Sequence, residues 1–180
     1  MRSLFCFVIE LLLMNLFDTS KQTKLEAEEI LNQTKLIPLL NKYGEVRVGG
    51  SYFTDLMYGP DIDITIATEN PRESAVKALN EIISNKICQK YQYGDFETYP
   101  RENRPQDHIL VLILPFKNRQ WEIEIWFTKN HYPEQIELEE KLKNLPLETK
   151  LKILELKANR DNSGIDKHNL SSFQIYKDFV

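Results

Sequence analysis

Residues 45–68 read EVRVGGSYFTDLMYGPDIDITIAT, and this stretch decides the fold that the sequence predicts. Glu45–Val48 predicts a short strand that runs into a turn at Gly49-Gly50-Ser51. Asp61–Thr68 predicts a second strand, because acidic, isoleucine and threonine residues alternate there with the period of two that is typical of a half-buried strand. Between the two strands, Tyr52–Tyr58 predicts a short helix.

Outward from this stretch, the sequence predicts one domain of helices and strands. The other expected elements are helices over 21–43, 70–88 and 133–157, with breaks near Pro38 and Pro146, and strands over 91–99, 109–114 and 121–127. This order predicts an α/β (α+β) fold: a mixed sheet of about four to five strands, helices mainly on one side, and a helical C-terminal tail. The last two strands are expected to form a hairpin, with Trp121–Phe127 close to Asp61–Thr68.

The composition excludes several classes of protein. The 180 residues carry a formal net charge of −4, which argues against a protein that binds nucleic acid mainly through a basic face, although a local patch could still hold an RNA end. Cys6 and Cys88 lie far apart and the three histidines occur singly, so the sequence has no disulfide framework, zinc motif or HExxH motif. We therefore expect a reduced, cytoplasmic setting.

An apolar segment from Leu4 to Phe17 superficially resembles the core of a secretory signal. Glu10 interrupts it, no small-residue cleavage motif follows, and the segment is too short to span a bilayer. We therefore expect residues 1–20 to be a helix, or a mis-assigned start with Met14 as the first translated residue. We expect no membrane association.

The two aspartates of the second strand are candidate metal ligands. Side chains alternate along a strand, so Asp61 and Asp63 project from the same face, with Cα atoms roughly 6–7 Å apart. Carboxylates this close raise each other's pKa unless cations are present. Because ligation by oxygen alone favours Mg²⁺ or Mn²⁺, and Mg²⁺ usually arrives with substrate phosphates, the pair predicts a site for a metal and a phosphorylated substrate.

A second acidic strand has the same alternation. In Trp121–Phe127 the aromatic and isoleucine residues would fill the core, while Glu122 and Glu124 face outward. If this strand lies beside the first, a third carboxylate joins Asp61 and Asp63, and two metal ions about 3.5–4 Å apart could hold the attacking and leaving oxygens of a displacement reaction.

Three other features of the sequence indicate local roles. Gly50 would let the backbone approach a triphosphate closely, and a helix that begins near Tyr52 would offer its first N–H groups to the anion. Asp55 is interpreted as a polar contact of this helix or loop. The charged residues Glu137, Glu139, Glu140, Lys141 and Lys143 are interpreted as a solvated helix face.

These motifs carry a resemblance to a known family. Val48-Gly49-Gly50-Ser51, followed ten residues after Ser51 by Asp61-Ile62-Asp63, resembles the GS-x(n)-DxD signature of the polymerase-beta-like nucleotidyltransferase superfamily. Over roughly residues 24–160 the chain is similar to small stand-alone bacterial members, which share Leu56-Met57 and the strand Trp-x-Ile-acid-Ile-Trp-Phe. Gly49-Gly50 and residues 55–59 also resemble the head domain of CCA-adding enzymes and poly(A) polymerases, which have Arg-Asp where this chain has Thr54-Asp55.

The resemblance implies a role for each motif. Asp61 and Asp63 would bind two Mg²⁺ or Mn²⁺ ions, and Glu124, commonly Asp in the family, would bind one of them and help to activate the acceptor hydroxyl. Gly49, Gly50 and Ser51 would bind the triphosphate of an NTP such as ATP. The implied regions are an N-terminal segment (1–20), a nucleotidyltransferase core (21–130) and a C-terminal helical segment (131–180).

The function implied is transfer of a nucleoside monophosphate from an NTP to a hydroxyl of an unknown acceptor, which is a small molecule, a protein or RNA. A second hypothesis is a catalytically silent protein of the same fold that binds a protein partner, as an antitoxin does. A third is a fragment without its closing helices, since residues 173–180 end on apolar residues.

Overall fold

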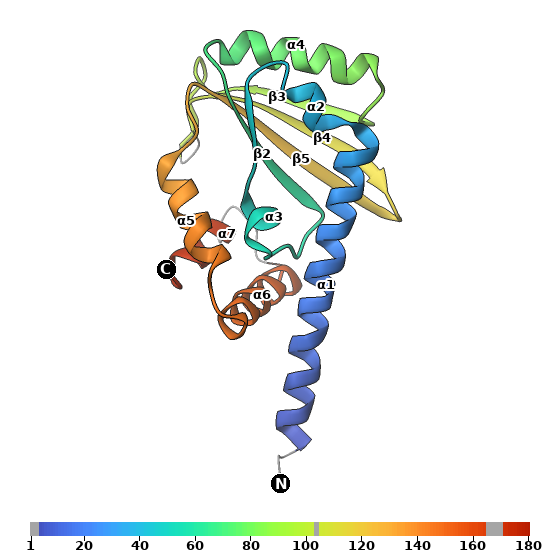
Figure 1. Cartoon of the computed structure of the whole chain (residues 1–180), viewed down its shortest axis with the longest axis vertical. Coiled ribbons are helices and arrows are strands. Elements are labelled where there is room, and N and C mark those ends of the chain that lie inside the picture. Colours follow the sequence, from blue (N-terminus) through green and yellow to red (C-terminus); the bar gives the residue numbers. More distant parts are fainter. Residues whose placement is uncertain (1–3, 103–104, 165–170) are drawn as a thin grey trace.

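The computed structural model describes residues 4–102, 105–164 and 171–180, with side chains from residue 14 onward (Figure 1). The helices are α1 (Leu4–Thr34), α2 (Leu36–Leu40), α3 (Gly50–Thr54), α4 (Pro71–Ser84), α5 (Pro133–Lys143), α6 (Leu147–Asn162) and α7 (Ser172–Lys177). The strands are β1 (Glu45–Val48), β2 (Asp61–Ala67), β3 (Lys90–Asp95), β4 (His108–Phe116) and β5 (Arg119–Thr128).

The five strands form one mixed sheet in the order β1-β2-β5-β4-β3. β2 and β5 run parallel, and the other neighbours are antiparallel. β4 and β5 form the predicted hairpin, whose turn residues Lys117 and Asn118 have φ values of 45° and 60°. Positive φ at both central residues is typical of a two-residue type I′ turn. The predicted fold class, the hairpin and the position of β5 beside β2 are therefore confirmed.

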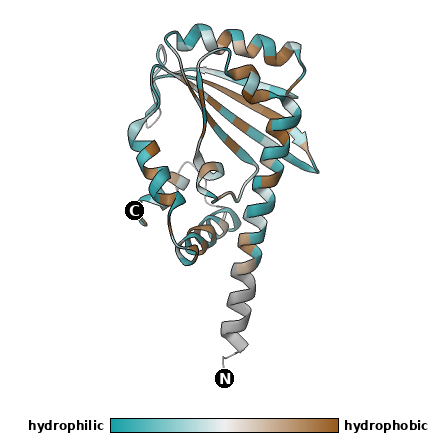
Figure 2. Cartoon of the chain, in the orientation of Figure 1, coloured by the Kyte–Doolittle hydropathy of each residue, from teal (hydrophilic) through white to brown (hydrophobic). Residues whose placement is uncertain are grey.

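The main core lies on one face of this sheet, where every second residue of β2, β4 and β5 is buried. Residues of α1, α2 and α4 cover this face. Figure 2 shows the corresponding alternation of hydrophobic and hydrophilic residues along the strands. A second, smaller core lies between α5, α6, α7 and the loop that follows α3. Its buried residues are Leu56, Leu142, Ile153, Leu154, Ile175 and Tyr176.

Two helix boundaries differ from the prediction. The expected helix 21–43 is interrupted at Lys35, which has a left-handed conformation with φ 51°, and not at Pro38 itself. A proline clashes with the carbonyl group four residues before it, so α1 ends at Thr34 and Pro38 lies in the first turn of α2, where its missing N–H costs nothing.

The other expected helix, 52–58, is α3 and begins and ends earlier. Asp55 takes a left-handed conformation with φ 61° and ends α3 after Thr54, and its neighbour Leu56 donates its N–H to the Ser51 carbonyl group at 2.9 Å. Aspartate is one of the few non-glycine residues that adopt this conformation routinely.

None of the described helices is long and apolar enough to cross a membrane. The cytoplasmic location stays a prediction, as does the division of the chain at residues 20 and 130. α1 runs through residue 20 without a break.

Candidate active site

The turn between β1 and α3 lies against the carboxyl group of Asp63. Gly49 donates its N–H to the Asp63 carbonyl oxygen at 2.9 Å. Gly50 has a φ of 59°, and a Cβ atom at this position would lie 2.0 Å from Asp63 Oδ2. Only glycine combines this left-handed conformation with so close an approach. The Gly-Gly turn and the first acidic strand are therefore one packed unit.

The register of β2 and β5 brings the acidic residues together. Asp61 is the partner of Glu122, and Asp63 is the partner of Glu124. Neighbouring strands lie about 4.8 Å apart, and the four side chains project from the face opposite the isoleucine core. Asp61, Asp63 and Glu124 are partly buried, whereas Glu122 is exposed. The structure thus places the three predicted acids on adjacent strands beside the Gly-Gly turn.

The acidic cluster changes the protonation of Asp63. Burial, together with the negative charges of Asp61 and Glu124, raises the pKa of the Asp63 carboxyl group to about 7. The ammonium group of Lys157 lowers this pKa, and the carboxylate of Glu139 raises it. When no cation balances the cluster, the Asp63 carboxyl group is therefore partly protonated near neutral pH.

The donor set fits a divalent cation of the Mg²⁺ type, because all three predicted ligands are carboxylates on one face. Within the part of the chain that the structure describes, no group of three or more acidic, histidine or cysteine side chains is arranged to hold a metal ion as it stands. The roles of Asp61, Asp63 and Glu124 as metal ligands stay predictions.

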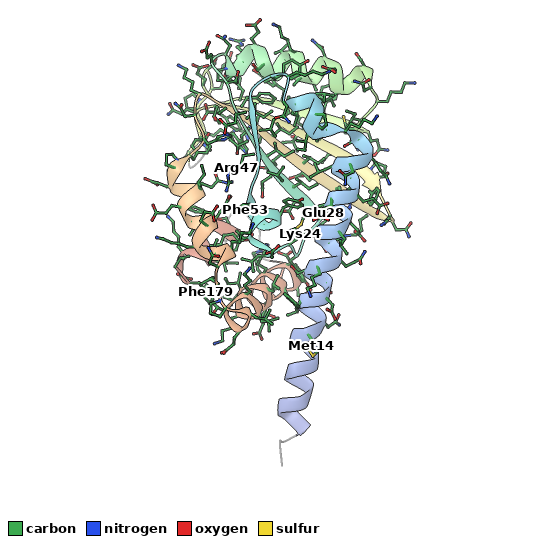
Figure 3. The ribbon with its side chains drawn as sticks, viewed as in Figure 1. Met14, Lys24, Glu28, Arg47, Phe53 and Phe179 are labelled. Carbon is green, nitrogen blue, oxygen red and sulfur yellow. The ribbon has the colours of Figure 1, made fainter. Side chains whose placement is uncertain are left out.

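An unpredicted carboxylate lies at the Gly-Gly turn. Glu139 of α5 accepts the Gly50 N–H at 2.7 Å and forms an ion pair with Arg47 of β1. Arg47 lies between β2 and α5 (Figure 3), on the sheet face that carries Asp63, because it is the register partner of Thr65. Its guanidinium group also lies 4.8 Å from the ring centroid of Phe53. The predicted triphosphate site at Gly49, Gly50 and Ser51 thus already contains an anion.

The interpretation of Glu139 as part of a solvated helix face is wrong, because the residue is 3% exposed. A weak signal was present in the sequence: Glu139 lies three residues before Leu142, which is fully buried, so the two share one face of α5. Nothing local in the sequence indicates its contacts with Arg47 and Gly50, which lie about ninety residues away.

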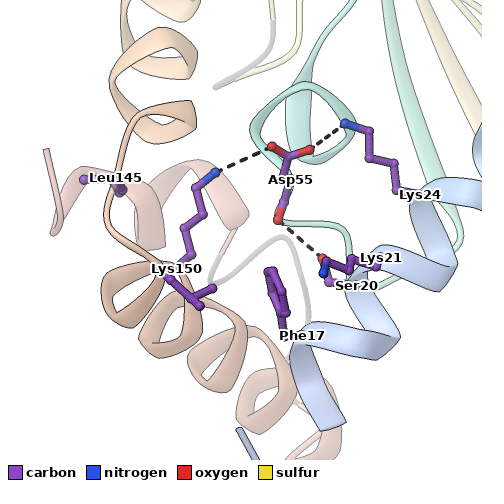
Figure 4. Close-up of a pocket in the computed structure, with 8 residues that line it drawn as sticks. Phe17, Ser20, Lys21, Lys24, Asp55, Leu145 and Lys150 are labelled. Atoms are coloured by element: carbon purple, nitrogen blue, oxygen red, sulfur yellow. Dashed lines mark hydrogen bonds and ion pairs between the residues drawn. The ribbon is translucent and has the colours of Figure 1, made fainter. Parts of the chain in front are cut away.

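Lysines of α6 and α1 bind the other end of α3. Lys157, which is 3% exposed, donates to the Leu56 carbonyl group at 2.7 Å, and Lys150 donates to the Thr54 carbonyl group at 3.1 Å. Asp55 forms ion pairs with Lys24 at 2.5 Å and Lys150 at 3.6 Å, at the wall of a cavity of about 480 Å³ between α1 and α6 (Figure 4). The predicted polar contact of Asp55 is therefore confirmed.

Comparisons with known proteins identify the fold. No protein family and no curated protein matches the chain. Among solved structures, the polymerase core of TRAMP, an RNA surveillance complex, matches 82% of this chain with a TM-score of 0.60 and 20% identity. A mutant of the Cid1 poly(U) polymerase bound to MgATP matches 86% of this chain with a TM-score of 0.62 and 14% identity. Cid1 in complex with its short product ApU matches 91% of this chain with a TM-score of 0.62 and 15% identity.

The chain thus has a nucleotidyltransferase-like fold, with a mixed five-stranded sheet and helices, as the sequence predicted. In fold it resembles the polymerase core of TRAMP and the Cid1 poly(U) polymerase. The chain spans about half of each matched structure: 47% of the TRAMP core, and 49% and 52% of the two Cid1 structures. At these identities the likeness establishes the fold alone.

The raised pKa of Asp63 predicts how stability depends on pH when metal is removed with EDTA. In the folded state the pKa of Asp63 is about 7, whereas the ordinary pKa of an aspartate is 3.8. Between these two values the folded state holds a proton that the unfolded state has lost. The stability that this proton contributes is therefore fully present below pH 4 and is lost as the pH rises through 7. Urea unfolding at pH 5 and 8 is therefore expected to show that Asp63→Asn gains stability relative to wild type toward pH 8, on the order of 2 kcal/mol. Glu140→Gln, a change at an exposed residue, is the control. If the free energy of unfolding changes equally between pH 5 and 8 in wild type and in Asp63→Asn, the prediction is wrong.

Proposed function

We propose that this protein is a metal-dependent nucleotidyltransferase that moves a nucleoside monophosphate from an NTP to an acceptor hydroxyl. The observation that carries this proposal is the pairing of Asp63 with Glu124 on adjacent parallel strands, with Asp61 on the same face and the Gly50 backbone against the Asp63 carboxyl group. The fold of the chain, which is that of nucleotidyltransferase enzymes, supports it.

The chemistry would be a single displacement at the α-phosphorus. The acceptor oxygen forms a bond to phosphorus, the bond to the bridging oxygen breaks, and pyrophosphate leaves. Asp61 and Asp63 would hold two Mg²⁺ or Mn²⁺ ions and Glu124 one of them; bound there, the ions would neutralise charge on the transferred phosphate and the leaving group. Glu124 would also orient the acceptor hydroxyl and favour loss of its proton.

The acceptor is a hydroxyl of a small molecule, a protein or RNA. One of the similar structures is a poly(U) polymerase in complex with a short product, ApU, which supports an RNA end as one acceptor to test. The net charge of −4 means that an RNA acceptor would need a local patch and not a basic face.

The test is a transfer assay with each of the four NTPs, Mg²⁺ or Mn²⁺, and acceptors of the three kinds. We expect pyrophosphate release and a labelled acceptor with wild type, and a rise in melting temperature when metal and NTP bind together. Asp61→Asn and Asp63→Asn are expected to abolish the product and most of the rise. A rise that persists in full in both variants would contradict metal binding at this site.

A second candidate is the catalytically silent protein that binds a protein partner. One observation favours it: the Gly50 amide, expected to bind phosphate, is bound by Glu139. If wild type neither binds NTP nor turns it over, and removal of the Glu139 charge restores neither, this second function is favoured.

A further inference from the structure

The carboxylate of Glu139 has the contacts that a phosphate group would make at the Gly-Gly turn. Its Oε1 accepts the Gly50 N–H at 2.7 Å and the side-chain amide of Gln135 at 2.8 Å, and its Oε2 forms the ion pair with Arg47. A backbone amide and an arginine are the donors that proteins commonly use for phosphate oxygens. A Cβ atom at Gly49 would lie 2.9 Å from Oε1, so this glycine leaves the room that the carboxylate occupies.

Glu139 and a bound triphosphate exclude each other. Both would need the Gly50 N–H and the Arg47 guanidinium group, and both are anionic. Glu139 accepts the N–H of Gly50, whose Cβ position lies 2.0 Å from Asp63 Oδ2, so its negative charge lies near the acidic cluster and adds to the repulsion among the carboxylates. A triphosphate that arrives with cations would relieve this repulsion, because the cations neutralise the acidic cluster.

The packing of α5 would allow Glu139 to move away from the Gly-Gly turn. Of its eleven residues, only Glu139 and Leu142 are buried, and Leu138 packs partly buried against the second core, so a small apolar surface holds this helix in place. Asn144–Pro146 joins it to α6, and at its other end the Tyr132 hydroxyl donates to Asp107 at 2.5 Å. Segments with few buried apolar contacts are the ones that open at low free-energy cost.

We propose that Glu139 is an internal substitute for a phosphate group, which closes the nucleotide site until α5 moves and NTP takes its place. This inference rests on the proposed nucleotidyltransferase function and adds a regulatory step to it. Once displaced, Glu139 frees the Gly50 amide and Arg47 to bind the phosphates. Any contact that draws α5 away from β1, such as a bound acceptor or partner, would then raise the affinity for NTP.

The first test is the affinity of Glu139→Gln for Mg²⁺ with each of the four NTPs, and with inorganic tripolyphosphate, by calorimetry. Glutamine keeps the shape and can still accept the Gly50 N–H, but it loses the charge that holds Arg47. We expect the dissociation constant to fall at least about tenfold relative to wild type. Glu140→Gln, an exposed change on the same helix, is the control and is expected to leave the affinity unchanged.

A second measurement needs no variant. Hydrogen exchange of wild type is expected to become faster over α5 when Mg²⁺ and NTP are added, while α4 is unaffected. If wild type binds NTP but Glu139→Gln binds it no more tightly, or if exchange over α5 does not change, the inference is wrong and the proposed function stands. If neither protein binds NTP or tripolyphosphate, both are wrong.

Discussion

Replacing Glu124 with glutamine is expected to lower kcat by about 10²–10⁴-fold, with a much smaller effect on the affinity for NTP. Glu124 is the register partner of Asp63 and is partly buried beside it, and under the proposed function it would act on the acceptor hydroxyl. A group that acts on the attacking oxygen stabilises the transition state more than it stabilises bound NTP. Steady-state kinetics with any acceptor that supports turnover measure this effect.

Glu122→Gln is the matched variant, because Glu122 lies two residues earlier on the same face of β5. Glu122 is exposed and is the partner of Asp61, not of Asp63. We expect this variant to lose much less activity. If Glu122→Gln is inactive and Glu124→Gln is active, Glu122 is the third ligand. If neither change matters, the reaction needs only Asp61 and Asp63, and the three-acid site is wrong.

Gly50→Ala is expected to abolish transfer and to destabilise the protein by about 2 kcal/mol or more. Two effects combine: alanine is strained at a φ of 59°, and its Cβ atom would lie 2.0 Å from Asp63 Oδ2. The Asp63 carboxyl group must then move away from the position in which it faces Asp61 and Glu124. Urea unfolding and the transfer assay measure the two effects separately.

Gly164→Ala separates backbone strain from the clash. Gly164 has a φ of 69°, but among the residues that the structure describes no heavy atom lies within 4 Å of the position its Cβ would take, so this variant has the strain alone. We expect it to lose less stability than Gly50→Ala and to stay active. Gly50→Ala is also expected to cost less stability in an Asp63→Ala background, since the nearest atoms are then gone. Equal costs at both glycines would show that the contact with Asp63 does not matter.

The alternation of apolar and polar residues was sufficient to predict β2 and β5 and the common face of their acids. The order of the elements along the chain predicted the mixed sheet and the hairpin, and a spacing close to 3.6 residues predicted the helical tail. Helix ends were predicted less well. α1 ends at Thr34, four residues before Pro38, because the proline ring clashes with the carbonyl group of the residue four positions earlier.

The sequence by itself identified the candidate site residues, which are Asp61, Asp63, Glu124 and the Gly49-Gly50-Ser51 turn. Only the tertiary structure showed that Glu124 is the register partner of Asp63, and that Glu139 of a distant helix binds the Gly50 amide. Alternation is a local property that the backbone enforces residue by residue, whereas strand register and the approach of α5 depend on how separate elements pack. A buried carboxylate next to a basic residue and a backbone amide has no periodic signature, so its place appears only once the chain has folded.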